Sequence, residues 1–573
     1  MALRIPSDSS RTKSRGPQRA GSTSPWRPLR TLRRRLRPPV TITAPPADIV
    51  IERDVAVPVR DGTVLRVNIF RPPGGGRHPV LLCAHPYSKD RTPVLRRFGR
   101  GYRIPFQYRL MPQSQPFAHS ALTGWEGPDP AYWVTRGYIV INADLRGWGT
   151  SGGVGDLLSE QEGLDCHDVI EWAAARPWSN GRIGMTGVSY LAITQWAAAS
   201  TRPPHLAAIC PWEGFTDVYR NFAHPGGVAE IGFLPIWGRG LRAQHRSPMV
   251  VDRMSRDRPL YDEYWAARAR PLEQIDVPAL ICGSFSDHNL HSVGSFEGFR
   301  RIGSQHAWLY THRGPKWATY YSADGLAVQA QFFDHFLAGQ DTGILQRAPV
   351  RIEVRADRDT ITAVRADTAW PPTGTVWHTL HLDSRTGTLA AQSPGVGGGW
   401  RFDTRRGCAS FTHRFDSDTE VVGSMLLSVA ISVRGADDLS LFAGVRKFTG
   451  GAEVLFEGSY GFTGDLVTHA TLLASHRRTD PQRSLPQLPF HPHTISEPLR
   501  PDEIVTLDLA LAPSATLFRA GEELRLDLQG HWFFAVNPFF GQFPARYAAS
   551  PRATATVHTG GDFASTLTIP TSP

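Results

Sequence analysis

Cysteine is scarce in this chain of 573 residues, which contains only Cys83, Cys166, Cys210, Cys282 and Cys408. Their number is odd, they are widely separated, and they form neither a C-x-x-C pair nor the Cys/His spacing of a metal site. This pattern argues against a disulfide framework, and we expect a cytoplasmic protein without structural disulfides. We also expect no metal site and no cofactor.

Long apolar segments are absent as well. No run of about 18 apolar residues occurs, so the sequence predicts no membrane-spanning helix and no membrane partner. The N-terminal region also lacks the apolar core of a secretory signal. The hydrophobic fraction of 41% is that of a globular protein, and the length favours two or three domains.

Excess charge of one sign is confined to one end of the chain. The formal net charge is +10, but residues 1–45 hold eleven of the 62 Lys and Arg residues and one of the 52 acidic residues. The other 528 residues therefore have no net charge. We predict that residues 1–45 form a disordered basic tail. Although Arg33–Arg35 could contact an anionic surface, we favour a solvated extension and expect no nucleic-acid partner.

The patterning predicts an α/β domain over residues 46–347. Short apolar runs, typical of buried strands, alternate with helical spacing, which indicates a parallel sheet covered on both faces. The clearest runs are Val80–Ala84, Tyr138–Ala143, Ile183–Thr186, Ala279–Gly283 and Ala307–Tyr310. Between about residues 212 and 272 the alternation stops, which indicates an inserted helical cap.

After residue 348 the pattern changes to period two. Leu426–Val433, Leu524–Leu528 and Ala553–His558 alternate between apolar and polar residues, and glycine, proline and aspartate separate them. This is typical of an all-β domain, and we predict a β-sandwich of the jelly-roll type over residues 348–573.

A candidate nucleophile is Ser189, in the stretch Gly187-Val-Ser-Tyr-Leu-Ala192. The serine follows an apolar run and precedes a helix-like run, as in the nucleophile elbow of hydrolases. The usual second glycine of that motif is absent, because Leu191 and Ala192 follow. Taken alone, Ser189 could be an ordinary turn residue.

A serine nucleophile needs a histidine to take its proton and an acid to orient that histidine. In α/β-hydrolases the chain order is serine, acid, histidine, each after a strand. Asp287 and His312 follow the apolar runs in this order, so we predict the triad Ser189, Asp287 and His312. His306 precedes its strand. His288 and His291 share the loop of Asp287, so this template leaves them out.

Several longer stretches carry a family resemblance. They are His85-Pro-Tyr-Ser-Lys89, Ala143-Asp-Leu-Arg-Gly147, Trp178–Leu191, Gly283-Ser-Phe-Ser-Asp287 and Ala520–Leu526. With these motifs in order, the chain from about residue 50 onwards resembles the cocaine-esterase and Xaa-Pro dipeptidyl-peptidase (CocE/NonD) family of α/β-hydrolases. The resemblance implies a hydrolase core with a helical cap and a C-terminal jelly roll.

The resemblance also implies an oxyanion hole formed by the phenol of Tyr87 and the backbone N–H of Tyr190. The chain departs from the family pattern at two places. Ala192 stands where members often have glycine. The family histidine often lies in a Gly-Pro-Trp-x-His context, whereas this chain reads Thr311-His-Arg-Gly-Pro-Lys-Trp317.

We therefore predict a cofactor-free serine hydrolase that cleaves small carboxylic esters, or amides, through an acyl-enzyme. The nearest alternative is an Xaa-Pro dipeptidyl-peptidase or acylase of the same family. A dipeptidyl-peptidase needs acidic or amide groups to hold a substrate ammonium, and the sequence identifies none. A binding protein with an inactive hydrolase core is the alternative from another class. The sequence does not predict the oligomeric state.

Overall fold

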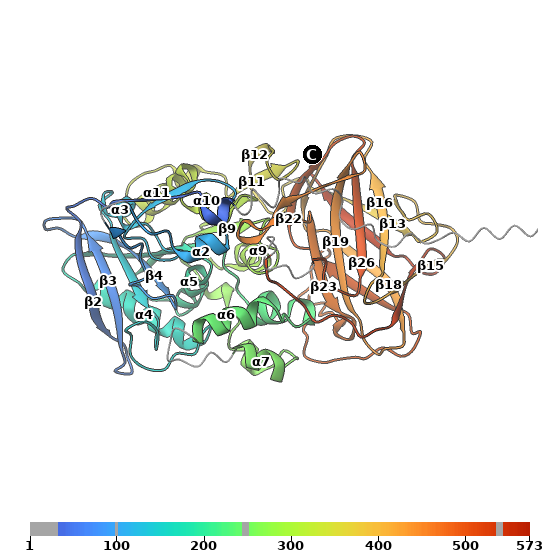
Figure 1. Cartoon of the computed structure of the whole chain (residues 1–573), viewed down its shortest axis with the longest axis horizontal. Helices are drawn as coiled ribbons and strands as arrows, with labels where there is room; N and C mark the ends of the chain where they lie inside the picture. Colours follow the sequence, from blue (N-terminus) through green and yellow to red (C-terminus); the bar gives the residue numbers. More distant parts are fainter. Residues whose placement is uncertain (1–32, 98–100, 243–250, 535–542, 573) are drawn as a thin grey trace, which may run out of the picture.

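The computed structural model describes residues 33–97, 101–242, 251–534 and 543–572. An α/β half and an all-β half lie side by side, with the all-β half at the right of Figure 1. Among the described residues, no helix is long and apolar enough to cross a membrane.

The α/β half is built on one mixed sheet. Its strands are β2 (Val50–Pro58), β3 (Val64–Arg71), β4 (His78–His85), β6 (Ile139–Asp144), β7 (Ser179–Val188), β8 (Leu206–Trp212), β9 (Ala279–Ser284), β10 (Ala307–His312), β11 (Val350–Arg355) and β12 (Ile361–Asp367). Their order across the sheet is β2-β3-β6-β4-β7-β8-β9-β10-β11-β12. The strands from β6 to β11 in this order are parallel, which places their carboxyl ends at one edge.

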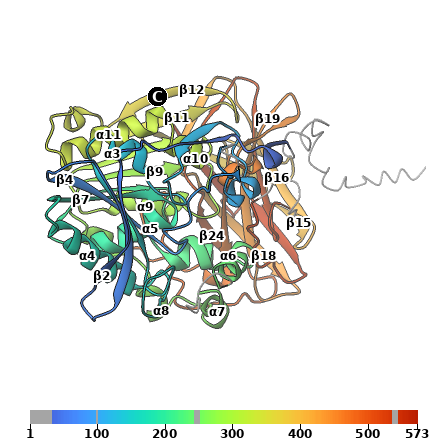
Figure 2. The same ribbon diagram turned by 60° about the vertical axis from the view of Figure 1, so that its left-hand side comes forward.

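Helices cover both faces of this sheet, as the apolar strands require. They are α3 (Pro130–Val134), α4 (Glu160–Ala174), α5 (Tyr190–Ser200), α9 (Ser292–Arg301) and α11 (Ala323–Phe336). Figures 1 and 2 show α4 and α5 on one face and α3 and α11 on the other. The α/β-hydrolase fold predicted from the sequence is confirmed.

The segment between β8 and β9 covers the region where the sequence predicts a helical cap. It contains α6 (Phe233–Arg242), α7 (Val251–Asp257) and α8 (Glu263–Ala266), together with the short turns η2 (Tyr219–Ala223), η3 (Pro225–Gly227) and η4 (Leu272–Gln274). Helices α6 and α7 lie along the lower side of the molecule in Figure 1.

One part of the predicted disordered tail is ordered. Residues 1–32 lie outside the described residues, but β1 (Val40–Thr43) pairs in parallel with β5 (Phe117–Ser120). The guanidinium of Arg109 also donates to the Leu36 carbonyl at 2.9 Å. The prediction of disorder to residue 45 is therefore wrong for Val40–Thr43, because this segment forms a two-stranded sheet with β5.

The second half is all-β, as predicted, and has a hydrophobic core of its own. Its strands are β13 (Val376–Asp383), β14 (Thr388–Ala390), β15 (Gly398–Asp403), β16 (Cys408–Arg414), β17 (Thr419–Gly423), β18 (Leu426–Arg434), β19 (Ser440–Thr449), β20 (Ala452–Val454), β21 (Phe456–Glu457), β22 (Thr463–Asp465), β23 (Thr468–Leu473), β24 (Val505–Ala510), β25 (Ser514–Phe518), β26 (Glu523–Gln529), β27 (Thr554–Thr559) and β28 (Thr566–Thr571). Alternating residues of these strands face the core, for example in β24 and β26.

The junction between the halves lies later than the boundary expected at residue 348. Strand β11 pairs in parallel with β10, so the hydrolase sheet continues past that position. At its end β11 also meets β25 of the all-β half, where Arg355 pairs with Thr516. The two halves are thus joined through backbone pairing as well as through side chains.

Candidate active site

Ser189 occupies a strained turn between β7 and α5. Its backbone has φ 61° and ψ −116°, a conformation that costs a non-glycine residue free energy and often marks a functional position. The Ser189 N–H donates to the Trp212 carbonyl at 3.1 Å, and the Ser189 carbonyl accepts from the Ile193 N–H at 3.0 Å. Gly187 makes the turn possible, because a Cβ there would lie 2.5 Å from Leu191 Cβ.

Ala192 stands where the elbow usually has glycine, and the segment that follows β8 leaves room for its methyl group. Ala192 is fully buried, and its methyl group faces Gly214, which follows β8. A Cβ on Gly214 would lie 2.5 Å from the Ala192 Cβ. Ala192 is therefore accommodated because the residue opposite has no side chain.

The histidine that contacts Ser189 is His291. Its Nε2 lies 2.9 Å from Ser189 Oγ, and both residues are buried. His291 is the N-cap residue of α9, on the loop that follows β9. Its ring stacks on Phe215, with ring centres 5.5 Å apart and planes 20° apart. This is the geometry of a serine and its general base.

Burial keeps this imidazole neutral. The pKa of His291 lies well below its ordinary value because of burial and, to a smaller extent, because of the nearby Lys316 ammonium. In the tautomer that carries the ring proton on Nδ1, Nε2 is unprotonated and can accept the Ser189 proton. Among the described residues, His291 Nδ1 has no hydrogen-bond partner.

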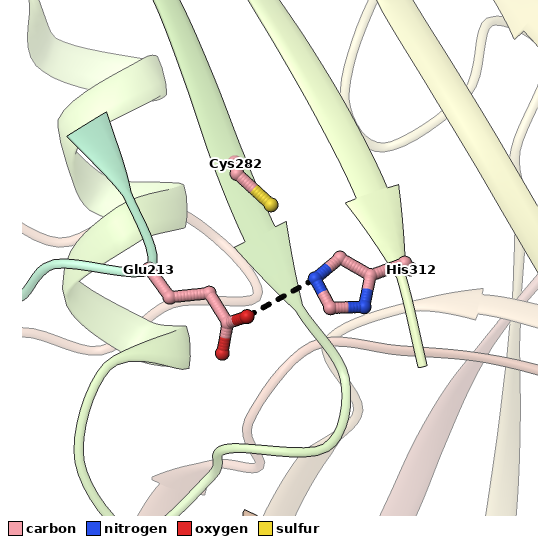
Figure 3. Close-up of side chains that lie close together, drawn as sticks. All are labelled: Glu213, Cys282 and His312. Atoms are coloured by element: carbon pink, nitrogen blue, oxygen red, sulfur yellow. Dashed lines mark hydrogen bonds and ion pairs between the residues drawn. The ribbon is translucent and has the colours of Figure 1, made fainter. Parts of the chain in front are cut away.

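His312, the histidine predicted from the sequence, is engaged elsewhere. It is the last residue of β10, and its Nδ1 accepts the Gly314 N–H at 3.1 Å. Its Nε2 therefore carries the proton and donates to Glu213 Oε1 at 3.1 Å (Figure 3). Both ring nitrogens are used within the protein, so the structure does not bring His312 to Ser189.

Cys282 faces the same space as Glu213 and His312, and the ligand atoms of the three buried residues lie within 4.8 Å of one another (Figure 3). The donor set is of a type that binds zinc. The fit is poor, however, because the Lys316 ammonium lies 3.6 Å from Glu213 Oε2 and already neutralises that carboxylate. Burial also raises the pKa of Cys282 well above its ordinary value, which disfavours the thiolate that a metal requires.

Asp287, the predicted orienting acid, is paired with a lysine. Its Oδ2 accepts from Lys316 Nζ at 2.6 Å, and both side chains are buried. Its backbone carbonyl accepts the N–H of His291 at 3.1 Å. The structure therefore places Asp287 on the loop of the base, four residues before it, with its carboxylate directed at Lys316.

A residue of the all-β half completes the surroundings of the nucleophile. The hydroxyl of Tyr460 lies 3.2 Å from Ser189 Oγ. Tyr460 is buried, and it lies on the turn between β21 and β22. Sequence analysis gave no indication of this contact, because 271 residues separate the two side chains.

Ser189 opens onto an apolar cavity of about 270 Å³. Tyr87, on the loop after β4, lines the same cavity, and Tyr190 follows Ser189 as the first residue of α5. N–H groups in the first turn of a helix have no acceptor within the helix, so the Tyr190 N–H is available to a ligand. Burial raises the pKa of Tyr87 well above its ordinary value, which keeps its phenol protonated.

Among the described residues that line the cavity, Glu126 supplies the carboxyl group. Its Oε1 accepts the Trp317 indole N–H at 3.1 Å, and its backbone carbonyl accepts the Val188 N–H directly before the nucleophile. Burial raises the pKa of Glu126 to about 8, although the Lys316 charge opposes this effect. Glu126 is therefore mostly protonated at neutral pH.

Known proteins share this arrangement of domains. Residues 61–316 match the model of the X-Pro dipeptidyl-peptidase (S15) family, and residues 342–568 match its C-terminal non-catalytic domain. A crystal structure titled as a CocE/NonD family hydrolase from Staphylococcus aureus is 35% identical, with a TM-score of 0.86, over 91% of this chain and 94% of that one. The chain belongs to the CocE/NonD family of hydrolases.

Two curated relatives illustrate the activities within this family. The cocaine esterase of a Rhodococcus species is 32% identical over 268 residues, which are 44% of this chain and 42% of the esterase. The Xaa-Pro dipeptidyl-peptidase of Ligilactobacillus salivarius is 29% identical over 119 residues, which are 18% of this chain and 15% of the peptidase. The matched region is thus less than half of either relative.

In this CocE/NonD hydrolase the predicted Ser189, Tyr87 and Tyr190 come together, whereas His312 and the carboxylate of Asp287 do not reach the nucleophile. Sequence reasoning missed His291 because it assigned one catalytic role to each strand end. The available signal was the Lys316 that interrupts the family's usual histidine context.

Proposed function

We propose that this hydrolase cleaves carboxylic esters through an acyl-enzyme, with Ser189 as the nucleophile and His291 as the general base. The observation that supports this assignment most directly is the 2.9 Å hydrogen bond between Ser189 Oγ and His291 Nε2. The lowered pKa of His291 supports it further, because a base must be neutral to accept a proton.

The proposed reaction has two symmetrical stages. Ser189 Oγ forms a bond to the ester carbonyl carbon while its proton passes to His291 Nε2. The tetrahedral intermediate then expels the alcohol, which takes that proton as the carbon–oxygen bond breaks. In the second stage water attacks the acyl-enzyme, with His291 again accepting the proton and then returning it to Ser189 Oγ.

The oxyanion of each intermediate is proposed to bind the Tyr87 phenol and the Tyr190 N–H. Both groups lie at the same cavity as Ser189, and both keep their protons at neutral pH. Removing one such donor from a serine hydrolase costs roughly 3–4 kcal/mol of transition-state stabilisation.

Asp287 is proposed to act through the loop and Lys316 and not by direct contact with the imidazole. Its carbonyl fixes the His291 backbone, and its carboxylate compensates the Lys316 charge. Without this compensation, the ammonium would oppose the positive charge that His291 gains during the reaction.

The geometry favours an esterase over an Xaa-Pro dipeptidyl-peptidase. A dipeptidyl-peptidase must bind a substrate ammonium, and the carboxyl group that lines the cavity, Glu126, is mostly neutral at pH 7. The cavity is otherwise largely aromatic and aliphatic, which suits an uncharged acyl group. A p-nitrophenyl ester and an Xaa-Pro p-nitroanilide, compared at equal enzyme concentration, decide between the two activities.

A fluorophosphonate probe tests the catalytic pair. The wild-type protein is expected to be labelled on Ser189, and Ser189→Ala to lose the label. His291→Ala is expected to slow labelling and ester turnover by roughly 10⁴- to 10⁶-fold, as in other serine hydrolases. Labelling of Ser189→Ala would contradict the nucleophile assignment.

His312→Gln is the matched control for the base. A glutamine amide can still donate to Glu213, so the folded variant is expected to react at close to the wild-type rate. If His312→Gln abolishes labelling while His291→Ala retains it, the assignment of the base is reversed. Circular dichroism and thermal melting establish that each variant is folded.

We also propose that the protein works in the cytoplasm on a small-molecule substrate. The five cysteines all lie unpaired, and four of them are buried, which suits a reducing compartment. Mass spectrometry after alkylation in denaturant tests this proposal, since five alkylated cysteines are expected from native cells.

A further inference from the structure

The turn between β21 and β22 brings the all-β half to the nucleophile. Three backbone hydrogen bonds close this turn: Gly458 to Phe462, Gly461 to Gly458, and Phe462 to Ser459. The turn also fits tightly against the hydrolase half, because a Cβ on Gly461 would lie 2.9 Å from the Pro112 carbonyl oxygen. The position of the turn relative to the catalytic residues is thus fixed from both sides.

Tyr460 sits in this turn with a left-handed backbone, φ 55° and ψ 27°. Such a conformation costs a non-glycine residue roughly 1–2 kcal/mol, and glycine would avoid the cost. A tyrosine held there in spite of the strain suggests a requirement for its side chain.

The phenol ring is held from several directions. It stacks on Phe543, with ring centres 5.5 Å apart and planes 8° apart. Its ring centre also lies 5.6 Å from that of Trp317. The Lys316 ammonium lies over its face, 3.9 Å from the ring centre. Since Lys316 also binds Asp287, the ring is linked to the loop that carries His291.

The proposed role of His291 as the base sets the direction of hydrogen bonding at Ser189. Ser189 has one hydroxyl proton, and in the tautomer that a general base requires, with the ring proton on Nδ1, His291 Nε2 accepts it. The Ser189 oxygen is then the acceptor for the Tyr460 hydroxyl at 3.2 Å. Burial raises the pKa of Tyr460 well above its ordinary value, so the phenol retains its proton throughout the working pH range.

We propose that Tyr460 is a catalytic residue, which the C-terminal domain supplies to stabilise negative charge on Ser189 Oγ. This inference rests on the proposed roles of Ser189 and His291. It gives a catalytic part to a domain whose family model is described as non-catalytic.

The role follows from the charge that develops on Oγ. As the Ser189 proton moves to His291, the oxygen gains negative character before its bond to the carbonyl carbon is complete. The Tyr460 hydroxyl donates to that oxygen and keeps its own proton, so no proton is transferred from the phenol. When the acyl-enzyme is hydrolysed, Oγ departs from the carbon with the same charge, and the same donor stabilises it.

Tyr460→Phe tests this role with little change in shape. The stacking on Phe543 and the contact with Lys316 remain, while the hydroxyl is lost. We expect the rate constant of fluorophosphonate labelling and the values of kcat/KM and kcat for esters to fall about 10- to 100-fold, the range for one hydrogen bond to a developing charge.

Leaving-group dependence separates this role from protonation of the departing alcohol. We compare the hydrolysis rates of p-nitrophenyl, phenyl and ethyl esters of one acid. If Tyr460 donates to Oγ, Tyr460→Phe should lower all three rates by a similar factor. A loss confined to the ethyl ester overturns the proposal and makes Tyr460 an acid for the leaving group. A rate within twofold of wild type for all three esters also overturns it.

Tyr547→Phe is the matched control, because Tyr547 is a buried tyrosine of the same half that packs on Trp532. It is expected to leave the rates unchanged, and a comparable loss in this variant would overturn the proposal. Fluorophosphonate labelling of the wild-type protein separately tests the proposed function on which this inference rests. Absence of Ser189 labelling there removes the proposed function itself, whereas normal wild-type labelling with an unaffected Tyr460→Phe removes only the role of Tyr460.

Discussion

At the scale of single residues, burial determines the protonation state of the groups around Ser189. Removal from water disfavours the charged form of any side chain, so buried histidine stays neutral and buried carboxyl and phenol groups keep their protons. His291, Glu126 and Tyr460 all shift in the direction that this effect requires. In the proposed reaction, a substrate carbonyl whose oxygen becomes negative would therefore meet one neutral base and several neutral donors.

The pH dependence of kcat/KM follows from these shifts. Protonation of His291 removes the base, and its lowered pKa places the acid limb below pH 6.5. Ionisation of Glu126, with a pKa of about 8, adds a negative charge beside the forming oxyanion, so activity should fall as the pH rises through 8. Glu126→Gln should lose this basic limb and keep the acid limb, as measured with a slowly hydrolysing ester. An unchanged basic limb in the variant would contradict the assignment.

Individual residues were predictable only where a local motif carries them. Ser189 and Tyr190 belong to an elbow whose strand, turn and helix are visible in the sequence. His291 was not predictable by the same route, because a histidine on the loop of the acid has no local pattern that marks it as the base. Which of His288, His291, His306 and His312 meets the serine depends on how the loops after β9 and β10 fold in space.

At the scale of elements, close packing at the elbow couples α5 to the chain that follows β8. The Ala192 methyl fills the space that a side chain on Gly214 would need. The larger residue at position 192 is therefore compensated by the absence of a side chain at position 214.

Gly214→Ala should destabilise the protein by about 1–3 kcal/mol through overpacking. Adding Ala192→Gly should recover part of that loss, although the backbone carbonyl carbon of Ala192 also lies within 3.1 Å of the new methyl. Denaturant unfolding of both single variants and the double variant gives the coupling free energy. Strict additivity would show that the two positions do not compensate each other.

The elements themselves were largely predicted. Short apolar runs mark the buried strands: β4, β7, β9 and β10 include the runs expected, and β6 includes its run except for Tyr138. The ends of elements were less predictable: His312 was expected on a loop but is the last residue of β10, where its ring turns towards Glu213.

At the scale of the whole molecule, the cap and the all-β half meet around three buried histidines. His476 Nδ1 lies 3.2 Å from His493 Nδ1, and the cap residue Gly227 packs against the His476 ring. His224 of the cap stacks on Tyr219, whose ring also contacts His493. Burial lowers the pKa of all three histidines, and that of His224 to about 4.

Acid should therefore weaken this contact. The unfolded chain binds protons to these histidines near pH 6.5, while the folded chain binds them only at lower pH, so stability is lost as the pH falls below 6.5. Each histidine that stays neutral contributes about 1.4 kcal/mol per pH unit. Urea unfolding at pH 7 and pH 5 should show a fall that is smaller in His493→Asn. An equal fall in both proteins would contradict this account.

The sequence by itself determined the two-part architecture and the family, and it indicated the proposed nucleophile, because each rests on periodicity or on residues that are neighbours in the chain. Only the tertiary structure brought His291, the proposed base, and Tyr460 to Ser189. Catalytic geometry depends on atoms that meet within about 3 Å, and residues 102 and 271 positions away reach that distance only after both halves have packed together.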